Sequence, residues 1–249
     1  MNRIRRERIK EYIDNKNVAT IKELQQLLPD ISLMTLHRDL DALEEQGFLA
    51  KYRGGVKSVH QLDDVEFNVR LRDNNPGKLC MAQKALSLLK PHSSVFLDAG
   101  TSNLFIAKNL PDISLNIVTT SPGIALELCH LSNPMVTMCC GALNRNNQSV
   151  CGQNTLEMLK KINIDIAFIG VSGCSADVGF TCGTEADMLV KKLVIEKART
   201  SVLICGNEKL KRLMPYTFAT MKDVDYVIID KPLSEDYVQS ARENGVTLL

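Results

Sequence analysis

The chain has 249 residues, which is enough for one or two domains of ordinary size. Hydrophobic residues make up 45% and charged residues 24%, as in globular proteins, and no apolar run is long enough to span a bilayer. The formal net charge is only +1, which excludes a generally polybasic or polyacidic binding surface but permits a locally basic one.

The 8 cysteines lack the spacing of a zinc site, because none forms a Cys-x-x-Cys pair or stands at zinc-ligand spacing from a histidine. The first ten residues are charged and no apolar core follows them, unlike a secretion signal. We therefore expect free thiols in a cytoplasmic protein, with no metal site and no other cofactor.

The sequence changes in character near residue 60. Residues 1–57 combine short amphipathic helices with arginine-rich edges and a glycine-bearing hairpin, whereas residues 78–249 alternate apolar β runs with helical patterns. Residues 58–77 are polar and end in a turn-forming tetrapeptide, so we predict a linker there. Three apolar residues of this segment predict that part of it packs on something: Phe67, Val69 and Leu71.

The first domain begins with a helical pattern over residues 3–15. Thr20 stands three residues before Glu23, which is the capping-box spacing that begins a second helix. Ser32 is the N-cap of a longer third helix, predicted over residues 33–46.

The third helix has one apolar and one polar side. At about 100° per residue, Leu36, Leu40 and Leu43 share one side and are expected to face the core. Gly47 ends the helix as its C-cap, and a hairpin over residues 48–57 follows, with Gly54-Gly55 at its tip or exit. A short helix, a tight connection and a longer helix with polar residues near its N-terminus indicate a helix-turn-helix, with the hairpin as its wing.

This arrangement supplies the groups that DNA recognition needs. Base edges require directional donors, and phosphates require hydroxyls and cations. Asp39 lies at the core edge of the helix, where we expect a hydrogen bond within the domain instead. From these residues alone, an alternative to DNA binding stays open, namely a small helical interaction module whose charged side chains only face solvent. The candidate DNA-binding residues are Arg5, Arg6, Ser32, Met34, Thr35, His37, Arg38 and Arg53.

The stretch Ser32-Leu-Met-Thr-Leu-His-Arg-Asp-Leu40, followed by Arg53-Gly54-Gly55, resembles the N-terminal signature of the DeoR family of bacterial sugar-metabolism regulators. The family pattern reads Ser-x-x-Thr-Ile-Arg-Arg-Asp-Leu, with a basic residue or histidine before Gly-Gly. His37 departs from this pattern, since the family usually has the first of two arginines at this position. Imidazole cannot make the bidentate contact that arginine makes to guanine. The resemblance implies a winged helix-turn-helix that binds double-stranded operator DNA.

The second domain is predicted to be an α/β domain. Alternating strands and helices imply a mainly parallel sheet that is covered on both faces and binds ligands beyond the carboxyl ends of its strands. The predicted strands lie at residues 95–98, 115–118, 135–138, 164–169, 201–204 and 226–229. The predicted helices lie at residues 102–109, 122–131, 155–161, 184–198 and 234–244.

The loop after the first of these strands predicts a phosphate cradle. Asp98 ends the strand, and Gly100, Thr101 and Ser102 begin a helix whose N–H groups and hydroxyls point to one spot. No Walker loop or Gly-x-Gly-x-x-Gly motif favours a nucleotide. Taken singly, such glycines and hydroxyls are also ordinary turn and cap residues. The candidate effector-binding residues, all in loops near strand ends or at helix starts, are Asp98, Gly100, Thr101, Ser102, Ser121, Gly141, Gly170, Glu185 and Lys209.

The DeoR resemblance continues in this domain. Phe96-Leu-Asp-Ala-Gly-Thr-Ser102 resembles the family's Leu-Asp-Ala-Gly-Thr-Thr loop, and Val118-Thr-Thr-Ser121 resembles Val-Thr-Asn-Ser, with Thr120 replacing asparagine. Lys209 falls at the lysine of Ser-Lys-Phe-Gly, with Lys211 in place of the glycine. The resemblance implies a sensor domain that is similar in fold to sugar-phosphate isomerases and binds a phosphorylated sugar or a related metabolite.

The sequence therefore predicts a winged helix-turn-helix followed by a mainly parallel α/β sensor domain. The resemblance implies a regulator, more specifically a repressor of a carbohydrate-utilisation operon, without catalytic residues. Its expected partners are operator DNA, a phosphorylated sugar and further copies of itself in a dimer or tetramer, but no membrane. The alternative is a sugar-phosphate isomerase-like enzyme with an accessory helical domain, in which Asp98 or Glu185 would be the general base.

Overall fold

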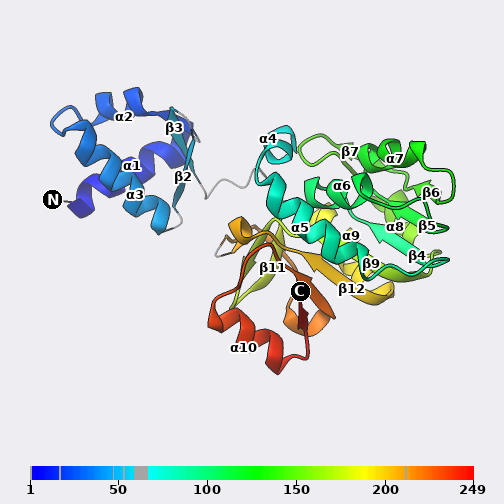
Figure 1. Cartoon of the computed structure of the whole chain (residues 1–249). Helices are drawn as coiled ribbons and strands as arrows, with labels where there is room; N and C mark the ends of the chain where they lie inside the picture. The colour runs from blue at the N-terminus through cyan, green and yellow to red at the C-terminus, as the bar shows by residue number, and fades with distance from the viewer. Residues whose placement is uncertain (1, 17, 47, 53, 59–66, 211) are drawn as a thin grey trace. The chain divides into compact units, whose positions relative to one another are not determined.

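The computed structural model describes residues 2–16, 18–46, 48–52, 54–58, 67–210 and 212–249. The chain divides into two compact units, Met1–Leu62 and Asp63–Leu249 (Figure 1). Helix α4 (Phe67–Arg72) and the start of α5 (Asn75–Leu86) fall within the segment predicted as a linker. Part of that segment therefore folds with the second unit.

The first unit contains the three predicted helices. The capping box is confirmed, because Glu23 N–H donates to Thr20 Oγ1 at 3.2 Å and Thr20 N–H donates to Glu23 Oε2 at 2.8 Å. Ser32 is confirmed as the N-cap of the third helix, since its hydroxyl accepts from Thr35 N–H at 3.2 Å. These helices are α1 (Asn2–Lys16), α2 (Ile21–Leu27) and α3 (Leu33–Glu45).

A three-stranded sheet completes the first unit. The predicted hairpin is confirmed as β2 (Leu49–Tyr52) and β3 (Gly55–Ser58), and the short strand β1 (Val18–Thr20) pairs antiparallel with β3. A Cβ at Gly55 would lie 2.5 Å from the carbonyl oxygen of Ala19, so glycine is what lets β1 and β3 approach here. The predicted C-cap Gly47 lies outside the described residues.

The core of the first unit forms as the apolar spacing predicts. Leu36, Leu40 and Leu43 of α3 are fully buried and pack against Ile9 and Ile13 of α1. This packing fixes α3 with its polar side directed away from the core.

The second unit is built on a seven-stranded parallel sheet. Its strand order is β15-β14-β12-β9-β4-β5-β6, and all six neighbouring pairs are parallel. Six of its strands are those predicted, so the parallel α/β prediction is confirmed. The strands are β4 (Ser94–Leu97), β5 (Asn116–Thr119), β6 (Met135–Met138), β9 (Ile164–Gly170), β12 (Ala198–Ile204), β14 (Tyr226–Ile228) and β15 (Thr247–Leu248).

Helices cover both faces of this sheet (Figure 1). Along β9, Ile166 and Phe168 join the core beneath α5, α6 and α7, whereas Ala167 and Ile169 join the core beneath α8, α9 and α10. Alternate side chains of a strand point to opposite faces, so one apolar run supplies both cores. The covering helices are α6 (Thr101–Lys108), α7 (Pro122–Glu127), α8 (Gln153–Leu159), α9 (Glu185–Lys197) and α10 (Glu235–Glu243).

Short elements at the periphery were not predicted, because their sequences lack the apolar run that marks the strands of the parallel sheet. Strands β10 (Gly173–Ser175), β11 (Gly179–Cys182) and β13 (Tyr216–Ala219) form an antiparallel sheet, and β7 (Ala142–Asn144) pairs with β8 (Ser149–Cys151). Single 3-10 turns lie at Leu128–His130, Asn207–Lys209 and Met221–Asp223. Within the described ranges, no helix has the length and apolar character needed to cross a membrane.

Candidate functional site

A pocket lies at the point where the strand order of the large sheet reverses. From β4 the chain adds β5 and β6 on one side, and it then returns to the other side of β4 with β9. The helical connections on the two sides leave opposite faces there, which opens a crevice beyond the carboxyl ends of the strands. The pocket is lined by residues 99–103 and 170–172, by Arg70, Asp73, Lys78 and Asn147, and by Asp187, Lys191, Glu208 and Lys209.

The first turn of α6 forms one wall of this pocket, as the cradle prediction expects. Its N-cap is Gly100, with φ +133°, a conformation that L side chains rarely adopt. Glycine has no side chain with which to cap this turn. The first N–H groups of a helix have no partner within the helix, and together with the helix dipole they favour an anion. Thr101 is buried and Ser102 is half-buried in the same turn.

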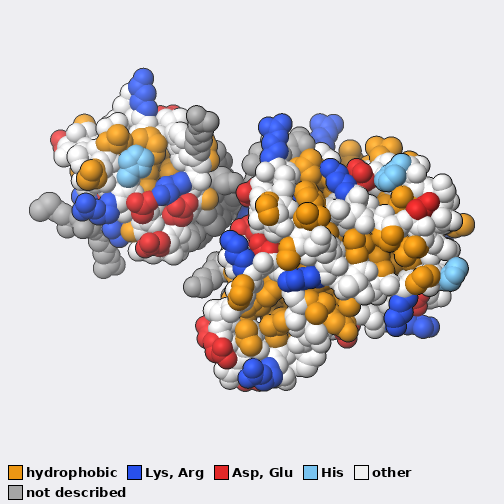
Figure 2. All heavy atoms as spheres, in the orientation of Figure 1, with side chains coloured by type: hydrophobic (Ala, Val, Ile, Leu, Met, Phe, Trp, Pro, Cys, Tyr) orange, Lys and Arg blue, Asp and Glu red, His pale blue; other side chains and the backbone are white. Residues whose placement is uncertain are grey.

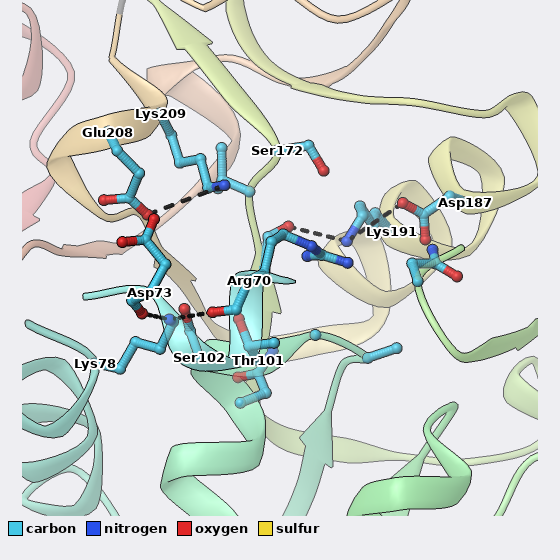
Figure 3. A pocket seen from close by; sticks show the side chains of 16 residues that line it. Arg70, Asp73, Lys78, Thr101, Ser102, Ser172, Asp187, Lys191, Glu208 and Lys209 are labelled. Carbon is cyan, nitrogen blue, oxygen red and sulfur yellow. Dashed lines mark hydrogen bonds and ion pairs between the residues drawn. The ribbon is translucent and has the colours of Figure 1, made fainter. Parts of the chain in front are cut away.

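Cationic side chains approach this wall from three other parts of the chain. Arg70 comes from α4, Lys78 from α5, and Lys209 from the turn after β12 (Figure 3). Lys209 Nζ lies 4.0 Å from Glu208 Oε1. Burial lowers the pKa of Lys78, whose ammonium donates to the backbone carbonyls of Arg70 and Asp73. The pocket therefore combines a helix N-terminus with several cations, which is a suitable environment for a phosphate group.

A buried ion pair holds the two strand ends together beneath the pocket. Asp98 Oδ2 accepts from Gly170 N–H at 3.0 Å and from the ammonium of Lys191. Lys191 Nζ also donates to the Gly170 carbonyl at 2.9 Å and lies 3.7 Å from Asp187 Oδ2. Burial opposes the charge on Lys191, but the carboxylates of Asp187 and Asp98 outweigh it and raise the pKa of this lysine. Asp98 thus positions the ends of β4 and β9 and does not itself line the pocket.

The side chain of Asn103 is the most unusual polar group at the site. It is fully buried in the first turn of α6 and contributes to the pocket lining. Neither its amide nitrogen nor its amide oxygen has a hydrogen-bond partner among the described residues. Because a buried amide without partners is unfavourable, this side chain is an independent indication that the pocket is completed by something polar.

The structure brings together only part of the predicted effector set. Gly100, Thr101, Ser102, Gly170 and Lys209 line the pocket, and Asp98 lies directly behind it. The other three predicted residues are not in the lining, and their roles in effector binding stay predictions. They are Ser121, which caps α7, Gly141, which is exposed after β6, and Glu185, which is exposed at the start of α9.

Several pocket residues were missed at the sequence level. Arg70 and Lys78 lie in or next to the segment predicted as a linker, so they were not considered. Asp187 and Lys191 are four residues apart on α9, which places them on one side of the helix. Their spacing in the sequence could have predicted an ion pair there. Asn103, Asn147 and Ser172 gave no comparable signal.

The polar side of α3 is the candidate DNA-binding surface of the first unit. Met34, His37 and Arg38 are exposed, and among the described residues their side chains have no hydrogen-bond partner. Ser32 and Thr35 lie at the start of the helix, where their hydroxyls share a hydrogen bond of 2.9 Å. Figure 2 shows Lys and Arg next to Asp and Glu side chains on the visible face of this unit, so the basic character is local.

Asp39 ties α3 to α1, in agreement with the predicted hydrogen bond within the domain. Its carboxylate is 2% exposed, accepts from Arg6 Nε at 2.9 Å and also accepts from Arg5 Nε. Burial disfavours its ionised form, but the hydrogen bonds from the two guanidinium groups outweigh this and hold the pKa of Asp39 below its usual range. Arg5 and Arg6 thus have a structural partner, and their contact with DNA stays a prediction.

The wing is fastened to the acidic half of α3. Lys51 Nζ pairs with Asp41 and lies 3.3 Å from Glu44 Oε2, and Lys51 N–H donates to Glu44 Oε1 at 2.7 Å. Arg53, the predicted wing contact to DNA, lies outside the described residues. This pairing joins the wing to the C-terminal half of α3, whereas His37 and Arg38 lie nearer the N-terminus of the helix.

Replacing Arg38 with Ala is expected to cost about 1–3 kcal/mol of specific DNA-binding free energy and to relax base preference at one operator position. Its guanidinium is exposed on the side of α3 opposite the buried leucines. Binding to a library of operator variants measures both effects. The control is Lys22→Ala, an exposed residue of α2, which should leave base preference unchanged. Undiminished operator selectivity in a folded Arg38→Ala protein would mean that α3 does not read the bases.

Comparisons with known proteins match both units. The sequence profile of the DeoR-like helix-turn-helix domain matches residues 5–62, and that of the DeoR C terminal sensor domain matches residues 73–231. The uncharacterized HTH-type transcriptional regulator YgbI of Escherichia coli (strain K12) is 32% identical over 98% of this chain and 96% of its own length. The HTH-type transcriptional repressor GlcR of Bacillus subtilis (strain 168) is 29% identical over 97% of this chain and 93% of its own length.

Among solved structures, the chain is similar to ribose 5-phosphate isomerase A from Methanocaldococcus jannaschii. The match has 18% identity and a TM-score of 0.42, and it covers 56% of each chain.

Proposed function

Since this chain belongs to the DeoR family of helix-turn-helix transcriptional regulators, we propose that it represses a carbohydrate-utilisation operon and that a phosphorylated sugar controls its affinity for operator DNA. The proposal assigns DNA binding to α3 and effector binding to the pocket beyond β4 and β9. A full-length relative is named as a transcriptional repressor, which supports the sign of regulation.

The main support for a phosphorylated effector is the composition of the pocket wall at the start of α6. Its uncapped first turn faces Arg70 and Lys209, so a phosphate would gain N–H donors, a favourable helix dipole and charge-assisted hydrogen bonds together. Asn147, Ser172 and Asp187 supply amide, hydroxyl and carboxylate groups for the hydroxyls of a sugar.

Control of DNA binding then follows from linkage. An effector that binds the DNA-incompetent arrangement more tightly than the DNA-bound one shifts the population away from the operator by that difference in affinity. Helix-turn-helix proteins commonly bind paired half-sites as symmetric dimers, so we propose a homo-oligomer, either a dimer or a tetramer.

Replacing Lys209 with Ala is expected to weaken the binding of the sugar phosphate about tenfold or more, because a hydrogen bond to a charged group is lost. Operator affinity without effector should stay at the parent value, since Lys209 belongs to the second unit. Thr101→Val should act in the same direction by removing one hydroxyl at nearly constant shape. Operator titrations with and without the effector measure both quantities.

The matched control for this prediction is Lys192→Ala, an exposed lysine of α9 that does not line the pocket. This variant should respond to the effector as the parent does. If Lys209→Ala also responds like the parent, the phosphate does not bind at this wall, and the loops there are ordinary helix starts.

The enzyme alternative receives little support from the geometry. Of its two candidate bases, Asp98 is buried against Lys191 and Glu185 is exposed away from the pocket. A thermal-shift screen of sugar phosphates, followed by turnover and operator-release assays on the hits, tests both ideas. Release of DNA without turnover supports the regulator, whereas isomerisation of a hit at enzymatic rates would overturn it.

The sign of regulation is tested by deleting the gene. If the protein is a repressor, transcription from the operator should rise, whereas a fall would identify an activator.

A further inference from the structure

The pocket contains a residue from the part of the chain that lies between the two matched domains. The DNA-binding profile ends at residue 62 and the sensor profile begins at residue 73, yet Arg70 of α4 lines the pocket. Helix α4 is the first described element after β3 of the DNA-binding unit. Part of the pocket lining therefore comes from the first described helix that follows the DNA-binding unit in the chain.

Among the described residues, contacts at both ends of α4 hold this part of the lining in place, and Leu71 packs against the same core as Phe67. Phe67 is 6% exposed in the core beneath α5 and α6, and its N–H donates to the Asn146 carbonyl at 3.2 Å. At the other end of α4, the buried ammonium of Lys78 binds the carbonyls of Arg70 and Asp73. A helix of six residues has little stability of its own, so its position depends on these contacts and on any added to them.

Arg70 is placed to add such a contact. Its side chain extends from α4 into the pocket, toward the region between Lys191 and the first turn of α6 (Figure 3). The opposite wall is the first turn of α6, where the buried amide of Asn103 has no hydrogen-bond partner in the described part of the chain. An anion bound on that turn would lie between the turn and the guanidinium, whose planar fork suits two phosphate oxygens.

We propose that Arg70 binds the phosphate group of the effector and thereby fixes α4, so that occupancy of the pocket orders the segment that leads to the DNA-binding unit. This inference rests on the proposed function, because it needs an anion in the pocket. Ordering by a bound ligand is a form of coupling that requires no large movement.

The experiment is amide hydrogen exchange on the full chain with and without saturating inorganic phosphate. In the parent protein, phosphate should slow exchange in the first turn of α6 and in α4. In Arg70→Ala, phosphate affinity should fall about tenfold or more, and at saturation the α6 turn should be protected while α4 is not. Arg70→Lys keeps the charge without the fork and should give partial protection of α4. Arg72→Ala, an exposed arginine two residues further along α4, is the matched control and should behave as the parent.

The outcomes separate this inference from the proposed function. Protection of α6 without α4 in the parent, or equal protection of α4 in the parent and in Arg70→Ala, would overturn the role of Arg70 and leave the anion pocket intact. Absence of protection in both elements would overturn the anion pocket and this inference with it. If Arg70→Ala fails to fold, the graded response of Arg70→Lys against Arg72→Ala decides the question.

Discussion

Replacing Lys191 with Met is expected to lower the free energy of unfolding of the second unit by about 3–5 kcal/mol, which is the usual cost of removing one partner of a buried ion pair. The lysine is 4% exposed and Asp98 is 1% exposed, so water cannot replace the lost ammonium. Methionine fills most of the same volume, which limits the contribution of a cavity. Urea unfolding monitored by a probe in the second unit measures the change.

Two further variants identify the cause of this loss. The double variant Lys191→Met with Asp98→Asn also removes one of the buried carboxylates that Lys191→Met alone leaves without its ammonium. Its loss in free energy of unfolding should therefore be smaller than the sum of the losses of the two single variants. Lys192→Met changes the exposed neighbour and should stay within about 0.5 kcal/mol of the parent. A loss below about 1 kcal/mol for Lys191→Met would mean that the ion pair does not hold β4 and β9 together.

Replacing Asp39 with Asn is expected to lower the free energy of unfolding of the first unit by about 2–3 kcal/mol. This is less than for a fully buried pair, because the Arg5 and Arg6 side chains are 17% and 27% exposed and water screens them partly. The substitution keeps the shape but removes the charge that ties α1 to α3. Asp41→Asn, on the exposed side of the same helix, is the control and should cost less than about 1 kcal/mol.

Asp39 also makes the stability of the first unit depend on pH. The folded pKa lies below the unfolded value of about 3.9, so the stabilisation is fully present above pH 4 and is lost as the pH falls toward the folded pKa. Glu23, whose pKa is lowered to about 2 by Lys16 and Thr20, is also protonated on acidification. Its effect cancels when the parent is compared with Asp39→Asn. The stability difference between the two proteins should therefore shrink on acidification, and a constant difference would contradict this role of Asp39.

The sequence predicted the elements that carry strong periodicity or a cap. The leucine side of α3, the capping box of Thr20 and six of the seven parallel strands were found in this way. The short strand β1 and the antiparallel sheet β10-β11-β13 were not, since their sequences mix small, polar and apolar residues and lack a clear apolar run. Their pairing depends on partners distant in sequence, such as β3 for β1.

The site was predicted mainly from one loop that contains several of its residues, with Gly170 and Lys209 added from two other strand ends. Gly100, Thr101 and Ser102 are adjacent in the sequence and pointed to a cradle that the structure places in the pocket wall. Arg70 and Lys191 reach the same pocket from elements far from this loop in sequence, so only the fold brings them there. Asp98 was predicted to contact the effector, because a carboxylate at the end of a strand is expected to be accessible. In the structure this carboxylate is buried in an ion pair with Lys191.

In the proposed mechanism, an anion-binding pocket in the second unit controls DNA binding by the first. The decisive experiment measures the operator affinity of the full chain, titrated with a sugar phosphate identified by thermal shift and, separately, with its dephosphorylated form. We expect the phosphorylated sugar to lower operator affinity and the dephosphorylated form to leave it unchanged, and Lys209→Ala should need about tenfold or more of the phosphorylated sugar for the same response. Equal release of DNA by both forms of the sugar would contradict this mechanism.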